Sequence, residues 1–549
     1  MFRRLAAACA ALSALAFVVM GATVPASAES YQRISGEGSS WAYNAISAMT
    51  VNVKQFGISV DYNPSGSSSG RKNWLNGTVD FAASDIPFQF HPADGSAPEK
   101  PTSGSYAYIP VVAGGTSFMY NLKINGQRVT NLRLSGENVS KIFTAVITKW
   151  NDPAIQADNP GLVMPDRQIV PVVRSDGSGS TAQFTLWMIK THPEIWNAYC
   201  ERTGHSGACG ETSFYPTVAG MIAQSGDPGV TSYVKANYAD GAIGYVNYSY
   251  ALESQFPVAK VLNHAGYYTE PTPENVAVSL LKARINTDES SDEYLTQVLD
   301  DVYSDSDARN YQLSSYSYFI LRTKTTDKFN EEKGKTLGAF AYYAMCQAQQ
   351  QSASLGYSPI PINLVQASLE QIRKIPGAVV QDIDITKCKN PTFSPDGTNL
   401  LADNAPQPQA CDKQGSSQCS TGTGGAKKTS TPVKAAASGG AASTGAKTGT
   451  TAARGSSGAT GPTGSTTGAG TTVDGGTLLA DQALDGTGGT TVEDPSASPT
   501  VLVGATGWAG AQTLILLVTL FTLALILLPP FMWRHLAARR DSNPTRTPL

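Results

Sequence analysis

The sequence lacks the features of a nucleic-acid-binding or metal-binding protein. Its 40 lysine and arginine residues are outnumbered by 43 aspartate and glutamate residues, so the net charge is -3. No basic stripe stands out, and we therefore expect no nucleic-acid partner. The cysteines form neither a C-x-x-C pattern nor a cysteine–histidine spacing suited to zinc. We accordingly expect no metal and no cofactor.

Large apolar side chains are almost absent from a long C-terminal stretch. From about residue 412 to residue 505 the sequence consists largely of glycine, serine, threonine and alanine. Such a segment cannot bury enough apolar surface to offset its conformational entropy. We therefore predict a disordered, low-complexity linker over residues 401–505.

Both ends of the chain carry membrane-targeting patterns. The N-terminus has a short basic region, an apolar stretch and an A-x-A cleavage site, which predict a signal peptide over residues 1–28. Residues 511–533 are uncharged, mostly apolar and long enough to span a bilayer. Arginines follow this run, which predicts a cytoplasmic tail over residues 534–549. We expect a single-pass protein of the cell membrane with residues 29–400 forming an extracellular domain.

Six cysteines remain after removal of the signal peptide, an even number typical of an oxidising compartment. Two pairs each bracket a short loop, and the third follows by elimination. The predicted disulfides are Cys200–Cys209, Cys411–Cys419 and Cys346–Cys388.

The most informative stretch is residues 170–190. An apolar run ends at Arg174, passes through a turn containing Ser178, Gly179 and Ser180, and continues as a helix-like segment. A helix N-terminus offers free N–H groups to an anion, and a guanidinium can bind two of its oxygens. Asp176 is close enough to hold that guanidinium in place. Taken alone, the stretch is equally well explained as a serine-capped helix after a tight turn.

Similar junctions occur twice upstream. Ser40 and Trp41 follow one short β-type segment, Ser67 follows the next, and Asp85 follows a third. In open α/β sheets, ligands bind at the carboxyl ends of the strands, where such turns gather. Each junction also has a structural explanation, since Ser40 and Ser67 could cap helices and Asp85 could be a turn residue. Strands alternate with helices along the chain, which indicates an α/β fold.

Several motifs, taken in order, resemble the PstS family, the extracytoplasmic phosphate-binding proteins of the high-affinity phosphate ABC transporter. The resemblance covers roughly residues 33–375. The motifs that carry it are Val79–Asp85, Ile109–Gly115, Leu134–Val139, Ile147–Ile155, Val173–Ser180 and Gly241–Val246. It implies a type II periplasmic-binding-protein fold with two α/β lobes joined by a hinge. Lobe 1 would comprise about 29–110 and 257–395, and lobe 2 about 111–256.

The resemblance also implies a phosphate site. The ligand-binding residues carried over by position are Ser40, Trp41, Ser67, Asp85, Arg174, Ser178, Gly179 and Ser180, with Asp176 bracing the arginine. Two of these depart from the family, because position 41 is usually Phe and position 180 usually Thr. A lipid anchor is common in the family, whereas a C-terminal span appears here instead.

The expected function is extracellular binding of hydrogen phosphate for delivery to a phosphate ABC permease, without enzymatic activity. Asp85 would accept the proton of hydrogen phosphate, whereas sulfate has none to offer. An unpaired buried charge costs about 3–5 kcal/mol, which would reject sulfate more than a hundredfold.

Two alternatives remain at this point. The protein could be a surface phosphate sensor or scaffold with no transport role. It could also be a serine hydrolase, because Gly66–Gly70 matches G-x-S-x-G with Ser68 as the nucleophile. No H-G-G-G motif accompanies that match, and no downstream histidine has a persuasive local context.

Overall fold

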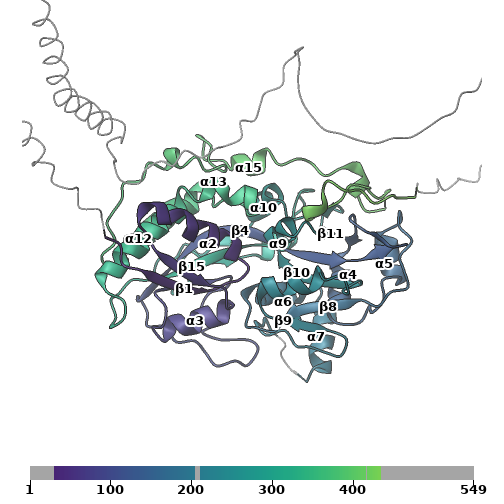
Figure 1. Ribbon diagram of the computed structural model, residues 1–549, viewed down its shortest axis with the longest axis horizontal. Coiled ribbons are helices and arrows are strands. Elements are labelled where there is room, and N and C mark those ends of the chain that lie inside the picture. The colour runs from purple at the N-terminus through teal and green to yellow at the C-terminus, as the bar shows by residue number, and fades with distance from the viewer. Residues whose placement is uncertain (1–29, 205–209, 416, 435–549) are drawn as a thin grey trace, which may run out of the picture. The chain divides into compact units, whose positions relative to one another are not determined.

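The structure is a computed structural model that describes residues 30–204, 210–415 and 417–434 (Figure 1). The predicted signal peptide, Cys209, the linker beyond residue 434, the predicted span and the cytoplasmic tail lie outside the described residues. Within the described ranges, no helix has both the length and the apolar character needed to cross a bilayer.

Lobe 1 is built on three parallel strands, β1 (Ile34–Gly38), β2 (Val60–Asn63) and β3 (Phe81–Ser84). Helices α2 (Tyr43–Asn52) and α3 (Ser67–Leu75) connect them, as expected for parallel neighbours, which need crossover connections. Their carboxyl ends therefore meet at one edge of the sheet.

Lobe 2 repeats this plan with β8 (Val170–Arg174), β9 (Ile222–Gln224) and β10 (Ala242–Asn247), which are parallel in the order β10-β8-β9. Helix α6 (Gly179–Thr191) follows β8, and α8 (Gly226–Val234) follows β9. Strand β11 (Val258–Leu262) also pairs inside this lobe, a few residues beyond the predicted lobe boundary.

A single long strand, β4 (Tyr106–Asn121), joins the two lobes. Its first part pairs antiparallel with β15 (Ser314–Arg322) of lobe 1 and its last part with β10 of lobe 2. All its residues are buried, which explains its apolar sequence. The sheets of both lobes thus form one eleven-stranded curled sheet with the path β2-β1-β3-β15-β4-β10-β8-β9.

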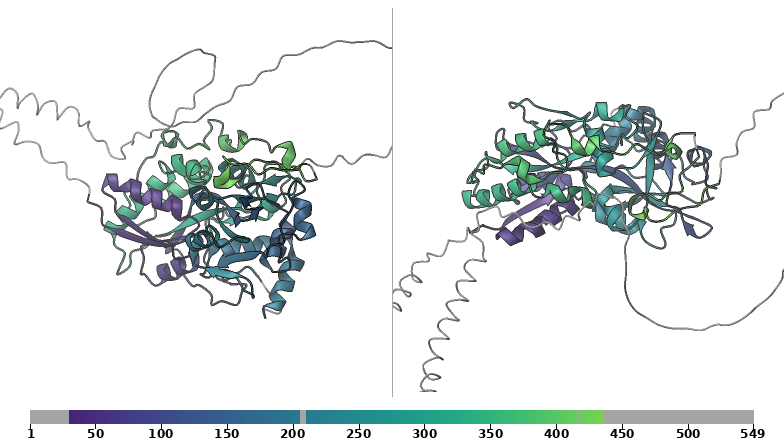
Figure 2. Two further views of the ribbon diagram at one scale, coloured as in Figure 1. Left: turned by 45° about the vertical axis from the view of Figure 1, so that its right-hand side comes forward. Right: turned by 90° about the horizontal axis from the view of Figure 1, so that it is seen from above.

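The remaining elements cover these sheets (Figures 1 and 2). The other helices are α4 (Gly136–Phe143), α5 (Pro153–Asp158), α7 (Pro193–Arg202), α9 (Tyr248–Glu253), α10 (Pro273–Leu280), α11 (Asp300–Tyr303), α12 (Glu331–Met345), α13 (Gln349–Ser352), α14 (Ile362–Ile372) and α15 (Leu400–Asp403). The short strands are β5 (Lys123–Ile124), β6 (Gln127–Arg128), β7 (Arg133–Leu134), β12 (Tyr268–Thr269), β13 (Arg284–Ile285) and β14 (Gln297–Val298). The 3-10 helices are η1 (Val53–Phe56), η2 (Ala353–Leu355), η3 (Ile385–Cys388), η4 (Ala410–Asp412) and η5 (Gly424–Ala426).

Aromatic side chains dominate both cores. In lobe 1, Phe81 packs against Phe319 and Phe340. In lobe 2, Phe184 of α6 packs against Phe143 and Tyr245. Each such ring removes a large apolar area from water, so these clusters fix α6 on its sheet and with it the turn that precedes α6.

Two predicted disulfides, Cys346–Cys388 and Cys411–Cys419, are confirmed. Cys200 is disulfide-bonded as well, and its predicted partner Cys209 lies outside the described residues.

The tail, residues 400–415 and 417–434, is folded onto the domain, so the prediction of a linker that is disordered from residue 401 is wrong for this part. In lobe 1, Ala402 and Ala405 pack against α10, and Arg309 Nη1 donates to both of their carbonyl oxygens. Farther along, Thr423 donates from its backbone N–H to the Thr130 carbonyl in lobe 2. The tail therefore contacts both lobes.

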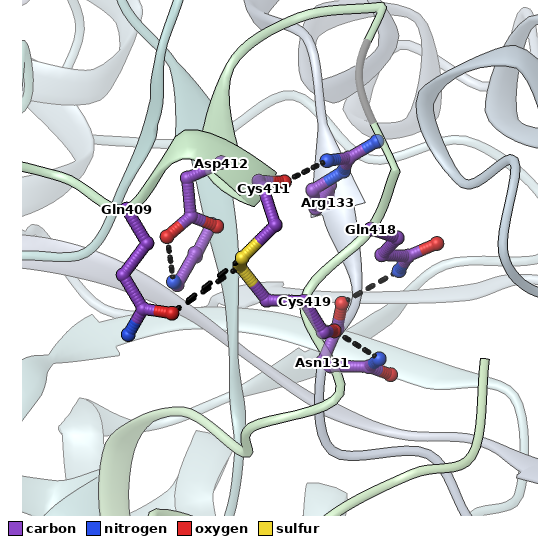
Figure 3. Close-up of a disulfide and its surroundings, with 8 residues drawn as sticks. Asn131, Arg133, Gln409, Cys411, Asp412, Gln418 and Cys419 are labelled. Carbon is purple, nitrogen blue, oxygen red and sulfur yellow. Dashed lines mark hydrogen bonds and ion pairs between the residues drawn. A yellow bond between two sulfur atoms is a disulfide. The ribbon is translucent and has the colours of Figure 1, made fainter. Parts of the chain in front are cut away.

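The disulfide Cys411–Cys419 lies where the tail is hydrogen-bonded to lobe 2 (Figure 3). Arg133 Nη1 donates to the Cys411 carbonyl at 2.9 Å, and Asn131 Nδ2 donates to the Cys419 carbonyl at 2.7 Å. Asp412, which is buried, forms an ion pair with Lys260. Polar side chains of lobe 2 thus satisfy backbone carbonyl groups of the tail here, a mode of packing that average hydrophobicity does not reveal.

Candidate functional site

In lobe 1, the start of α3 and the turn after β3 face the turn after β8 and the helix α6 of lobe 2. The Ser68 backbone N–H, at the start of α3, donates to the Gly177 carbonyl at 3.0 Å. Gln183 Nε2, in α6, donates to the Asp85 carbonyl at 3.2 Å. The structure therefore brings the predicted residues of the two lobes together in a closed arrangement.

Asp85 lies directly after β3 and is 2% exposed. Its Oδ1 accepts hydrogen bonds from Ser39 Oγ at 2.6 Å and from Ser317 Oγ at 2.7 Å. Burial raises the pKa of this carboxyl to about 6, although the two serine hydrogen bonds oppose the rise. A carboxyl of this kind takes up a proton more readily than an ordinary aspartate.

Arg174, the last residue of β8, is 2% exposed and held by two carboxylates. Its Nε donates to Asp176 Oδ1 at 2.8 Å, and its Nη2 donates to Asp176 Oδ2. Its Nη1 donates to Asp227 Oδ2 at 2.6 Å. Burial alone would lower the pKa of Arg174, but the charges of both aspartates outweigh burial and raise it.

The N-terminus of α6 lies beside this guanidinium. Ser178 caps the helix, because its Oγ accepts from the Thr181 N–H at 3.1 Å. Ser180 Oγ lies 3.3 Å from Arg174 Nη1. The N–H groups of Gly179 and Ser180 belong to the first turn of the helix, where no intrahelical acceptor exists. They can therefore be offered to an anion.

Gly179 lies at a close approach between the lobes. A Cβ atom there would lie 2.6 Å from Ser67 Oγ and 2.9 Å from the Asp85 Cβ. Ser67 Oγ is itself 3.4 Å from Asp85 Oδ2. Only glycine fits against this wall of lobe 1, which explains its place in the motif.

Ser40 and Trp41 lie in the same region but with different partners from those expected. Ser40 Oγ donates to Asp227 Oδ2 at 2.7 Å, and the adjacent Ser39 contacts Asp85 instead. Trp41 is buried, and its Nε1 donates to Thr116 Oγ1 at 3.1 Å.

Sequence reasoning missed three residues of this cluster. Ser39 stands next to a predicted residue in the same turn, so only the geometry of the turn distinguishes the two. Ser317 lies in the middle of β15, where nothing in the sequence marks it. Asp227 belongs to a Gly-Asp-Pro-Gly stretch that is typical of a turn.

The serine-hydrolase alternative is not favoured by the surroundings of Ser68. This residue lies in the first turn of α3, as a G-x-S-x-G motif would require. Its Oγ, however, accepts from Arg71 Nη2 at 3.4 Å. A guanidinium stays protonated and cannot serve as the general base that a serine nucleophile needs.

A cavity of about 380 Å³ adjoins this cluster, and Ser68, Arg71 and Phe214 are among its lining residues. The loop 88–105 closes one side, because Glu99 forms an ion pair with the buried Arg71. Across the described part of the chain, no group of three or more His, Cys, Asp or Glu side chains is arranged to hold a metal ion.

Comparison with known proteins shows which family the chain is similar to. The model of the PBP superfamily domain matches residues 23–348. The chain is 31% identical to the phosphate-binding protein PstS of Xylella fastidiosa over 347 residues, covering 63% of this chain and 86% of that protein. It is 33% identical to the PstS of Pasteurella multocida over 339 residues, covering 61% of this chain and 88% of that protein.

The chain is also similar to a solved structure of a high affinity periplasmic phosphate-binding protein (PfluDING) bound with phosphate. The sequence identity is 19%, the TM-score is 0.49, and the match covers 64% of this chain and all of the other.

Proposed function

This chain belongs to the PstS phosphate-binding proteins of the PBP superfamily, and we propose that it binds inorganic phosphate between its two lobes for an ABC transporter. The observation that carries the proposal is the meeting of Asp85 and Arg174 beside the N-termini of α3 and α6. That arrangement brings together one cation, one proton acceptor and backbone donors.

Each component matches one requirement of a desolvated hydrogen phosphate ion. The first-turn N–H groups of α6 and the positive end of its dipole suit the phosphate oxygens. Arg174 supplies the full positive charge, and Asp176 holds its guanidinium plane. The hydroxyls of Ser67, Ser178 and Ser180 complete the donor set that we propose.

Asp85 distinguishes phosphate from sulfate in this proposal. When ionised, it accepts the proton that hydrogen phosphate carries, whereas a sulfate oxygen would face the same carboxylate with no proton between them. A charge left unpaired in a buried site costs about 3–5 kcal/mol, which corresponds to more than a hundredfold in affinity.

The location is part of the same proposal. The signal peptide and the apolar run 511–533 support an extracellular domain held at the cell membrane by its C-terminus. A tethered sensor without a transport role would share this arrangement. Phosphate uptake by cells that lack the protein separates the two roles, because loss of the protein lowers uptake only if it serves a transporter.

Calorimetric titration of the purified full-length protein tests the binding function. We expect saturable binding of phosphate and arsenate and at least about a hundredfold weaker binding of sulfate. Arg174→Gln should abolish phosphate binding. The matched control is Arg309→Gln, since Arg309 is likewise held by an aspartate two residues away but lies under the tail. The proposal fails if phosphate does not bind, or if both variants bind it as the wild type does.

A further inference from the structure

The loop 88–105 of lobe 1 is anchored beside the proposed phosphate site. Its base is closed by two hydrogen bonds, because the Gln89 N–H donates to Glu99 Oε2 and the Glu99 N–H donates to the Gln89 carbonyl, both at 2.8 Å. Glu99 also pairs with Arg71 of α3, which is 2% exposed and donates from Nη1 to Ser84 Oγ at 2.9 Å. Ser84 is the last residue of β3, so the base of the loop is fixed at the edge of the sheet where the site lies.

The middle of the loop is hydrogen-bonded to lobe 2. Thr212, which is 6% exposed, donates from Oγ1 to Asp94 Oδ2 at 2.7 Å. Burial alone would raise the pKa of Asp94, but the hydrogen bonds from Ser96 and Thr212 outweigh burial and hold that pKa below its usual value. Asp94 is therefore ionised at neutral pH, and a hydrogen bond to a charged acceptor is stronger than one between neutral groups.

A close contact between Ala93 and Gly210 lies beside this hydrogen bond. A Cβ atom at Gly210 would lie 2.1 Å from the Ala93 Cβ. Two carbon atoms cannot approach each other that closely, so a methyl group at position 210 would push the loop away from lobe 2.

The lobe 2 side of this contact is connected to the turn that precedes α6. The Ser178 N–H donates to the Ser213 carbonyl at 2.9 Å, and Ser213 follows Thr212 directly. A continuous path of backbone and hydrogen bonds therefore leads from Ser178 in lobe 2, through Thr212 and the loop, to Arg71 in lobe 1.

The walls of the site must separate before a ligand can leave. Gly179 of lobe 2 approaches Ser67 and Asp85 of lobe 1 so closely that no Cβ atom fits between them. A ligand enclosed at this place is released only when the lobes move apart. Because Asp94 and Thr212 belong to different lobes, that movement breaks their hydrogen bond as well.

We propose that the loop 88–105 is a latch, which holds the lobes closed through the hydrogen bond between Asp94 and Thr212 and so sets how long phosphate stays bound. This inference rests on the proposed function, because it concerns release from the same site. The latch forms only once the lobes have closed. It therefore slows the dissociation of phosphate and leaves the association rate nearly unchanged.

The test measures phosphate dissociation from the full-length protein, loaded with radiolabelled phosphate and then mixed with excess unlabelled phosphate. The association rate follows from this rate and the calorimetric affinity. For Asp94→Ala we expect the dissociation rate to rise at least about fivefold and the association rate to change less than about twofold.

The matched control is Asp288→Ala. Like Asp94, Asp288 accepts from the N–H of a serine two residues later at 3.0 Å, and it lies in an exposed loop. The hydrogen bonds that the structure describes for the Asp288 side chain stay within its own loop. Its replacement should alter neither rate.

A double-mutant cycle separates a latch from a general loss of stability. Thr212→Val removes the hydroxyl donor, so Asp94→Ala should have little further effect on dissociation in that background. Gly210→Ala disturbs the same contact without removing a charge and should also speed dissociation, whereas Gly229→Ala, which has room for a methyl group, should not.

The inference is overturned if Asp94→Ala releases phosphate at the wild-type rate, or if its effect persists in full in the Thr212→Val protein. If Asp94→Ala does not fold, release by Gly210→Ala at the wild-type rate overturns the inference in the same way. Absence of phosphate binding by the wild type would instead overturn the proposed function.

Discussion

Replacement of Asp85 by asparagine should stabilise the ligand-free protein while it weakens anion selection. Burial raises the pKa of this carboxyl from 3.8 to about 6, so the folded protein binds the proton more tightly than the unfolded chain does. Asp85 therefore makes the fold more stable below pH 4 than at neutral pH. This contribution to the free energy of unfolding is lost as the pH rises through about 6. At 1.36 kcal/mol per pKa unit, the ionised carboxylate costs about 3 kcal/mol at pH 8.

Asparagine removes this cost without removing the local hydrogen bonds. Its Oδ1 can accept from Ser39 and Ser317 as the aspartate does. We expect Asp85→Asn to raise the free energy of unfolding by up to about 3 kcal/mol at pH 8 and to leave it nearly unchanged at pH 4.

Urea unfolding in buffers free of phosphate and sulfate, at pH values from 4 to 8, measures this difference. Asp166→Asn serves as the control, because its carboxylate is exposed and should give no such trend. The same Asp85→Asn protein should discriminate less between phosphate and sulfate in a titration. A stability difference that does not vary with pH would refute the reasoning, since it would show that ionisation of Asp85 is not the source of the cost.

Three further outcomes test the surrounding structure. Gly179→Ala should lower the affinity for phosphate at least about tenfold, because the added methyl group holds the lobes apart. Gly229→Ala is the control, since there is room for a methyl group at that position and the affinity should not change. Equal titration curves for the two variants would contradict the close approach at Gly179. Joint replacement of Cys411 and Cys419 by serine should lower the free energy of unfolding by about 2–3 kcal/mol, because the disulfide closes a loop with a sequence separation of 8. A chain ending at residue 410 should melt at least about 5 °C below one ending at residue 434, and equal melting temperatures would mean that the tail adds no stability.

The site residues that could be predicted are those whose position follows from the residues next to them in the sequence. Arg174 and Asp85 each end a short apolar strand, and parallel strands place their carboxyl ends at one edge. Ser178 precedes a helix and caps it, as its residue type favours. For these residues, local chemistry and the global fold agree.

The parts that could not be predicted depend on contacts between distant segments. Ser317 reaches Asp85 across the pairing of β15 with β3, which no local pattern records. Asp227 contacts Ser40 across 187 positions of sequence. Which of two adjacent serines faces which carboxylate is decided by the backbone of one turn.

The tail shows how composition can mislead. Residues such as Thr423 and Gln418 are nearly fully buried, although their segment resembles a linker by composition. Their burial is made favourable by hydrogen bonds, because Gln418 Nε2 donates to the Asn131 carbonyl and Thr423 N–H to the Thr130 carbonyl. Apolar content, which guided the prediction, does not measure this kind of packing.

The path of the tail also determines where a mechanical force on the chain would be transmitted to the domain. A pull on the chain beyond residue 434 first meets the hydrogen bond from the Lys434 N–H to the Gly161 carbonyl, and then the Thr421–Ser430 bridge. Behind these lies the covalent loop closed by Cys411 and Cys419, which cannot be peeled open one hydrogen bond at a time. Force would therefore enter through the lobe that carries Arg174.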